Sequence, residues 1–148
     1  MDQSTLAENH TSADRGQGRR AVLVVDDDVQ FRGYLSELLD SHGFRVLQAA
    51  NGKEGLEIYR RHHPDLVITD IVMPEEEGIG MIWNIRRDTT AMPIIAISGG
   101  NRGYGADYLR MATRLGVNAT LAKPFSHRDL MQAVQRLLGF DRQGVKDE

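Results

Sequence analysis

Five short runs of apolar and β-branched residues recur along the chain, and each is followed by a segment with apolar residues every three or four positions. Runs this short, bounded by turn residues, predict strands buried on both faces. The segments between them predict amphipathic helices. The strands are expected at 20–25, 44–50, 66–70, 93–98 and 118–122, and the helices at about 29–41, 52–63, 79–87, 106–115 and 127–138.

Polar residues mark where three of these helices begin. Asp28 precedes the first helix and is suited to cap it. Asn51 is followed three residues later by Glu54, and Ser126 by Asp129, which is the spacing of a capping box. Each of these caps fixes the point at which a strand or loop gives way to a helix.

Large apolar residues at helical spacing are expected to face the core. In the first helix Phe31, Leu35 and Leu38 fall on one apolar face. In the fourth, Met111 and Leu115 share a face and are expected to be buried.

The regular alternation of strands and helices predicts an α/β fold. Connections between parallel strands are right-handed, which places helices on both faces of the sheet. We expect a doubly wound (βα)5 sandwich of three layers, flavodoxin-like, with five parallel strands in the order 2-1-3-4-5. In such a sheet the ligand site lies at the carboxyl ends of the strands, between the first and third strands.

Four of the five strands end in polar residues. The first is followed by Asp26 and Asp27, the third ends at Asp70, the fourth at Ser98 and the fifth at Lys123. Three carboxylates at one edge repel one another unless a divalent cation joins them, and all-oxygen ligands suit Mg²⁺. A carboxylate nucleophile with a cation, a hydroxyl and a lysine predicts a phosphoryl-transfer site.

These segments resemble the receiver domain of two-component response regulators, in particular the stand-alone, chemotaxis-regulator-like kind. The resemblance covers about residues 20–139 and rests on four motifs in order. They are Val-Val-Asp-Asp-Asp at 24–28, Thr-Asp-Ile-Val-Met-Pro at 69–74, Ala-Ile-Ser at 96–98 and Ala-Lys-Pro-Phe at 122–125.

The resemblance implies a role for each residue of the site. Asp70 would accept a phosphoryl group from a histidine kinase or a histidine phosphotransfer protein. Ser98 would form a hydrogen bond to that group and Lys123 would pair with it. Mg²⁺ would be held by Asp26, Asp27, Asp70 and the backbone carbonyl of Val72. The Lys123-Pro124 peptide bond would be cis.

The sequence departs from the family pattern on the face that receiver domains use to signal. The position three residues before Lys123 usually carries an aromatic that moves with the hydroxyl of Ser98, and here it is Thr120. The segment between Ser98 and Lys123 is also longer than usual and begins with a glycine-rich loop at 99–105. We therefore expect that phosphorylation triggers a conformational switch in which Ser98 and Thr120 take part. In this switch residues 99–108 should rearrange more than Thr120 moves.

Composition excludes several classes of protein. The chain of 148 residues has no cysteine, which excludes disulfides and thiolate metal sites. Its net charge of −3 gives no reason to expect nucleic acid binding, and no apolar run is long enough to cross a bilayer. We expect a cytoplasmic protein that binds neither nucleic acid nor membrane. Its expected parts are a disordered N-terminal extension (1–18), a receiver domain (19–140) and a charged tail (141–148).

Two other functions stay open at this stage. A Mg²⁺-dependent phosphatase with an aspartyl nucleophile would usually carry an acidic residue two positions after the nucleophile, where this chain has Val72. A receiver-like interaction module that is never phosphorylated would be expected to have lost an acidic residue or the lysine. We therefore expect a phosphoacceptor that assists only its own phosphorylation and dephosphorylation, and that signals through a partner protein or a phosphorelay.

Overall fold

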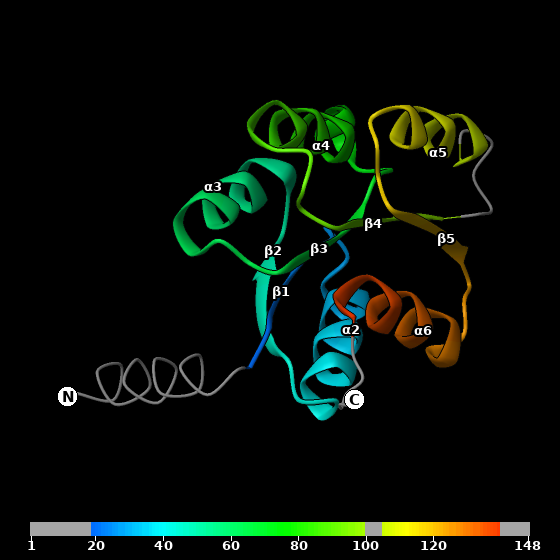
Figure 1. The fold of residues 1–148 in the computed structure, drawn as a ribbon. Coiled ribbons are helices and arrows are strands. Elements are labelled where there is room, and N and C mark those ends of the chain that lie inside the picture. The colour runs from blue at the N-terminus through cyan, green and yellow to red at the C-terminus, as the bar shows by residue number, and fades with distance from the viewer. Residues whose placement is uncertain (1–18, 100–104, 140–148) are drawn as a thin grey trace.

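The computed structural model describes residues 19–99 and 105–139 (Figure 1). The expected N-terminal extension, most of the glycine-rich loop and the expected charged tail lie outside these residues. In the part that is described, no helix is long and apolar enough to cross a membrane.

Strands and helices alternate along the chain as the sequence predicts, with boundaries that differ by one or two residues. The strands are β1 (Ala21–Val25), β2 (Arg45–Ala49), β3 (Leu66–Asp70), β4 (Ile94–Gly99) and β5 (Ala119–Lys123). The helices are α2 (Val29–Ser41), α3 (Gly52–His62), the short 3₁₀ helix η1 (Pro74–Glu76), α4 (Glu77–Asp88), α5 (Gly105–Arg114) and α6 (His127–Leu138).

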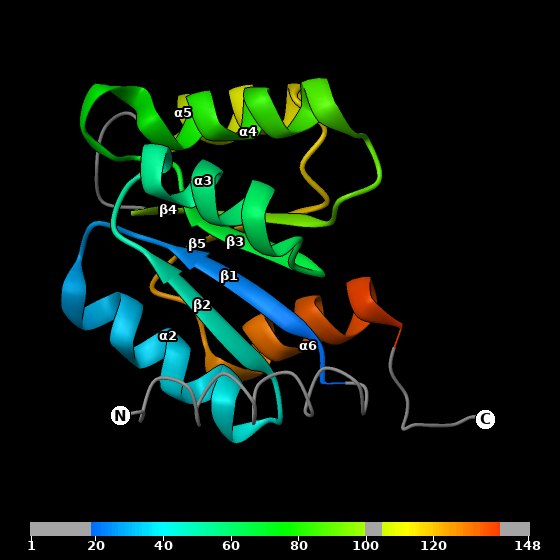
Figure 2. The same cartoon turned by 90° about the vertical axis from the view of Figure 1, so that its left-hand side faces the viewer.

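All five strands are parallel and lie in the order β2-β1-β3-β4-β5, which confirms the predicted topology. Helices α2 and α6 cover one face of the sheet, and α3, α4 and α5 cover the other (Figures 1 and 2). Alternate residues of β1 pack on opposite faces of the sheet. Val22 and Val24 pack with α2 and α6, and Leu23 and Val25 pack on the other face. The fold is therefore a three-layer sandwich with a core on each side.

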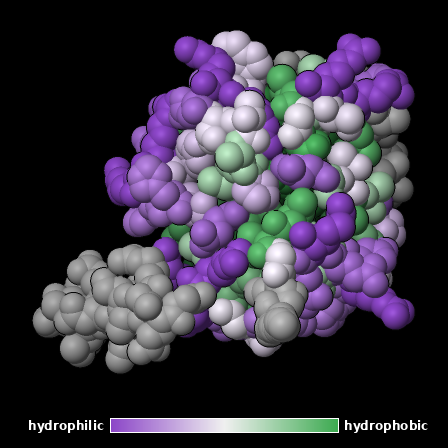
Figure 3. Space-filling view, in the orientation of Figure 1, coloured by the Kyte–Doolittle hydropathy of each residue, from purple (hydrophilic) through white to green (hydrophobic). Residues whose placement is uncertain are grey.

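Hydrophilic residues dominate the surface drawn in Figure 3. Hydrophobic side chains gather there chiefly in a band between the upper and lower helices, where the sheet lies in Figure 1. The helices thus carry their polar faces outward, as amphipathic segments on both sides of a buried sheet require.

The predicted caps are formed. The carboxylate of Asp28 accepts hydrogen bonds from the backbone N–H groups of Gln30 and Phe31 at the start of α2. The side chain of Asn51 accepts one from Glu54, whose own carboxylate accepts from the N–H of Ala50 at 2.7 Å. In a capping box the Glu side chain would accept from the N–H of the cap residue, Asn51. Here Glu54 accepts instead from the residue before the cap, Ala50.

Helix α4 begins two residues earlier than the sequence predicts. Its first residue, Glu77, places a carboxylate at the helix N-terminus and accepts a hydrogen bond from the N–H of Gly52. Just before it, Glu75 takes a left-handed conformation with a φ of 62°. This left-handed turn lies in η1, directly before α4.

The start of α4 lies directly against the end of β3. A Cβ atom at Gly78 would stand 2.5 Å from the carbonyl oxygen of Asp70 and 2.6 Å from the Cα atom of Ile71. Only a residue without a side chain lets the two backbones approach so closely. Gly78 therefore sets the position of the backbone that carries Asp70.

Substituting Gly78 tests this close approach. Gly78→Ala is expected to lower the free energy of unfolding by about 1–3 kcal/mol, because neither backbone can move away cheaply. Gly80→Ala is the matched control in the same helix, where an added Cβ meets nothing within 4 Å. The control should be neutral or gain up to about 1 kcal/mol from helix propensity. Equal stability of the two variants in urea unfolding would contradict the packing described here.

Candidate phosphoryl-transfer site

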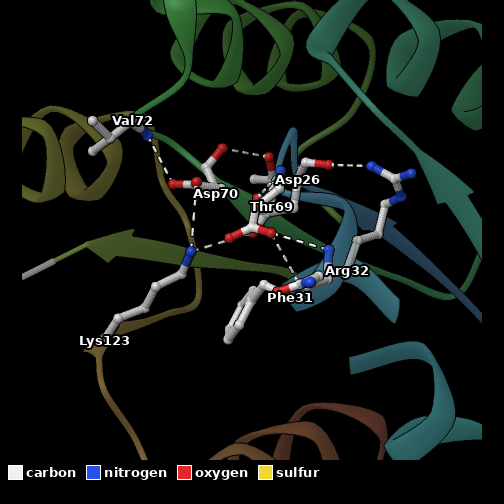
Figure 4. Close-up of polar contacts among 9 residues, drawn as sticks. Asp26, Phe31, Arg32, Thr69, Asp70, Val72 and Lys123 are labelled. Carbon is white, nitrogen blue, oxygen red and sulfur yellow. Dashed lines mark hydrogen bonds and ion pairs between the residues drawn. The ribbon is translucent and has the colours of Figure 1, made fainter. Parts of the chain in front are cut away.

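Polar side chains from four elements meet at the carboxyl edge of the sheet. The arrowheads of β1 and β2 point to this edge, on the left of Figure 2. Asp26 follows β1, Asp70 ends β3, and Lys123 ends β5 and points toward both carboxylates (Figure 4). The site therefore lies where open parallel sheets bind their ligands.

Three carboxylates form the centre of the site. Oxygen atoms of Asp26, Asp27 and Asp70 all lie within 4.8 Å of one another. Asp26 and Asp70 are buried, whereas Asp27 is exposed. Like charges this close destabilise one another, and burial adds the cost of removing two of them from water.

The electrostatics reflect this crowding. Burial raises the pKa of Asp70 to about 6, the Val72 N–H opposes the rise, and the neighbouring Asp26 adds to it. Burial also raises the pKa of Asp26, against the effects of the Asp28 N–H and of Lys123. Both carboxyl groups therefore gain from a cation that shares their oxygens.

Backbone groups orient the two buried carboxylates. The N–H of Val72 donates to Asp70 Oδ1, and the N–H of Asp28 donates to Asp26 Oδ1, each at 2.9 Å. Arg32 donates from Nη1 to the carbonyl oxygen of Asp26 at 2.6 Å and so supports the loop after β1 from α2. One oxygen of each carboxylate is thereby fixed, and the other is left for a cation.

Lys123 supplies positive charge from the far side of the pocket. Its Nζ atom lies 3.4 Å from Asp26 Oδ2 and 3.8 Å from Asp70 Oδ2, and its side chain is 23% exposed. One ammonium group facing three carboxylates leaves a local excess of negative charge. The peptide bond that follows, Lys123-Pro124, is cis as expected.

Ser98 brings a hydroxyl that the surrounding protein does not satisfy. Its side chain is buried, and Oγ has no hydrogen-bond partner within residues 19–99 and 105–139. A buried hydroxyl without a partner costs free energy, so its presence at the end of β4 suits a ligand that brings a hydrogen-bonding group.

The donor set fits Mg²⁺. It consists only of oxygen atoms, is strongly anionic and has one exposed member, Asp27, which leaves room for water ligands. Val72 is adjacent, because its N–H contacts Asp70, and its carbonyl oxygen remains the predicted further ligand.

Thr120 lies apart from this arrangement. It is exposed on the edge strand β5 and is in register with Ala96, whereas Ser98 is in register with Ala122. The expected switch, in which Ser98 and Thr120 take part, stays a prediction. Most of the loop expected to respond instead, residues 100–104, lies outside the described residues.

Two residues of the site were not singled out from the sequence. Arg32 contacts the Asp26 carbonyl, and Phe31, expected to face the core, is half-buried with its ring beside Lys123. The one feature of the sequence that could have indicated their role is their position in the first turn of the helix that follows the acidic loop.

Asp70→Asn tests the electrostatic cost of the cluster. The raised pKa means that the folded protein binds the proton of Asp70 more tightly than the unfolded chain does. The penalty is therefore absent below about pH 4, grows as the pH rises toward 6, and is complete above it. Without metal near pH 7, the variant should be more stable to unfolding by about 1–3 kcal/mol. A difference in stability that persists unchanged at low pH would argue against this cause.

Comparison with known proteins agrees with this geometry. The family model described as "Response regulator receiver domain" matches residues 22–135. A solved structure of a response regulator receiver domain protein from Clostridium thermocellum superimposes with a TM-score of 0.75 at 30% identity, covering 81% of this chain and 94% of that one. The chemotaxis protein CheY4 of Vibrio cholerae superimposes with a TM-score of 0.72 at 26% identity, covering 81% and 99% of the two chains.

Curated relatives are similar over the same region. The protein named "Transcriptional regulatory protein PdtaR" from Mycobacterium tuberculosis is 35% identical over 126 residues, which cover 84% of this chain and 59% of the relative. "Probable transcriptional regulator ycf27" from Cyanophora paradoxa is 34% identical over 120 residues, which cover 81% and 48%. The chain thus spans about half the length of the curated relatives it matches. By its family match and its fold, the chain belongs to the response regulator receiver domain family.

Proposed function

We propose that this protein acts as a response regulator through its receiver domain. In this proposal Asp70 accepts a phosphoryl group from a histidine kinase or a histidine phosphotransfer protein. The modified protein then signals through a partner protein or a phosphorelay. The observation that carries the proposal is the convergence of the acidic cluster and Lys123 beside the unsatisfied hydroxyl of Ser98 at one sheet edge.

In this proposal each side chain has a distinct task. An oxygen of Asp70 forms the bond to phosphorus while the phosphorus–nitrogen bond of the donor breaks, and the electron pair of that bond stays on the imidazole. Oδ2 of Asp70 is the better candidate, because Oδ1 already accepts the Val72 N–H and Oδ2 faces Lys123. The Lys123 ammonium balances charge on the transferred oxygens, and the Ser98 O–H can donate to one of them. Bound Mg²⁺ would neutralise further charge on the same oxygens.

The residue composition favours a phosphoacceptor over an enzyme with repeated turnover. Val72 stands two residues after Asp70 and has no proton to give or take, so general acid–base catalysis from that position is excluded. The acyl phosphate would therefore persist long enough to be sensed. We propose a protein as its downstream partner, since the net charge of −3 gives no attraction for nucleic acid.

The direct test is phosphorylation by a small-molecule donor. Acetyl phosphate with Mg²⁺ should add one phosphoryl group to the intact protein by mass spectrometry, and Asp70→Asn should abolish the addition. Asp40→Asn, at an exposed carboxylate of α2, is the matched control and should behave as the wild type does. Rapid phosphate release without an adduct would indicate the phosphatase. No reaction at all would favour the interaction module, and incorporation in Asp70→Asn at the wild-type level would refute the assignment of Asp70.

Asp27→Ala tests the metal site separately. Asp27 is exposed, so its loss should leave stability to unfolding nearly unchanged, while removal of one anionic ligand should weaken Mg²⁺ binding by about tenfold or more. Calorimetric titration with Mg²⁺ measures this effect. An unchanged affinity would exclude Asp27 as a ligand, whatever the fate of the phosphorylation assay.

A further inference from the structure

The ammonium group of Lys123 lies against an aromatic ring as well as against carboxylates. Its Nζ atom is 4.0 Å from the centroid of the Phe31 ring (Figure 4). The electron-rich face of an aromatic ring attracts a cation at this distance. Lys123 is therefore held between a negative cluster on one side and the face of Phe31 on the other.

The ring of Phe31 is itself held in place. Its backbone N–H donates to the capping carboxylate of Asp28, which fixes the first turn of α2. Phe125, two residues after Lys123, meets the ring edge to face, with centroids 5.9 Å apart and planes at 83°. Tyr34, one turn further along α2, lies 6.1 Å away. Contacts on this many sides make the ring a fixed surface for the lysine.

Lys123 needs such a surface. A lysine side chain loses considerable rotamer freedom when its end is fixed. The Lys123 Nζ atom lies 3.4 Å from Asp26 and 3.8 Å from Asp70, and both distances are long for charge-assisted hydrogen bonds. A ring face orients the ammonium without accepting a conventional hydrogen bond, so its N–H groups remain available for an incoming phosphoryl oxygen. An aliphatic side chain of the same bulk would fill the space but would not attract the charge.

We propose that Phe31 is a positioning residue for phosphoryl transfer: its ring holds the Lys123 ammonium over the pocket by a cation–π contact. This inference rests on the proposed function, because it assigns Phe31 a part in the same reaction. Phe31 acts through Lys123 and does not touch the reacting atoms. The contact also joins the first turn of α2 to the end of β5.

Fluorination of the Phe31 ring separates the effect of its charge distribution from the effect of its shape. Phe31 is replaced by 4-fluoro-, 3,5-difluoro- and 3,4,5-trifluorophenylalanine, which keep the size of the ring but progressively weaken its negative face. The rate of phosphorylation by acetyl phosphate at saturating Mg²⁺ should fall stepwise along the series. The total decrease should reach about two- to fivefold, the size expected for a partly exposed cation–π contact.

Conventional variants provide the controls. Phe31→Tyr keeps an aromatic face and should retain most of the rate, whereas Phe31→Leu should lose about as much as the trifluoro variant. Trp83→Leu removes an exposed aromatic of α4 whose ring contacts Arg87, outside the Phe31 cluster, and it should leave the rate unchanged. In NMR spectra the ε-CH₂ protons of Lys123 should be shifted upfield by the ring, and this shift should disappear in Phe31→Leu.

The outcomes distinguish this inference from the proposed function. Wild-type phosphorylation with a flat rate across the fluorinated series overturns the role of Phe31 and leaves the function intact. Absence of phosphorylation in the wild type overturns both, even if the NMR shift still shows the contact. A stepwise decrease, with Trp83→Leu unaffected and thermal stability unchanged along the series, supports the positioning role.

Discussion

The mutual repulsion of Asp26, Asp27 and Asp70 is the constraint around which the carboxyl edge of the sheet is arranged. Two of these carboxylates are buried, and their oxygens lie within 4.8 Å of those of the third. Such a cluster is costly in the absence of a cation. The fold tolerates it because N–H groups and Lys123 offset part of the charge. The negative charge that remains favours the binding of a divalent cation to the three carboxylates.

Helix α2 supports this cluster from its first turn. Asp28 caps the helix, Arg32 donates to the carbonyl of Asp26, and Phe31 lies against Lys123. On the opposite side of the sheet, the close approach at Gly78 fixes the backbone of Asp70. The site is thus supported by elements from both helical layers, an arrangement that suits the pre-organisation of the proposed phosphoryl transfer.

The fold and the main site residues could be predicted from the sequence because both depend on local patterns. Short buried runs identify the strands, and the polar residue that ends each run must lie at the carboxyl edge. Contacts between distant segments could not be predicted in this way. Helical spacing placed Phe31 against the core, where its half-buried ring does pack, but it did not show that Lys123, at the end of β5, lies over the same ring. Met111 was expected to be buried but is 40% exposed, because α5 packs mainly through residues such as Ala112. The expected switch at Ser98 and Thr120 depends on motion, which the strand pattern does not specify.

In the proposed reaction Asp70, Ser98 and Lys123 converge on one transferred group beside a metal ion. A crystal structure with Mg²⁺ and beryllofluoride, a mimic of the acyl phosphate, would reveal this convergence. We expect beryllium on a carboxylate oxygen of Asp70, fluorine atoms within hydrogen-bond distance of Ser98 Oγ and Lys123 Nζ, and Mg²⁺ on the three aspartates. Beryllofluoride bound at another residue, or a complex in which Ser98 and Lys123 turn away from it, would show that these three side chains do not act on one group.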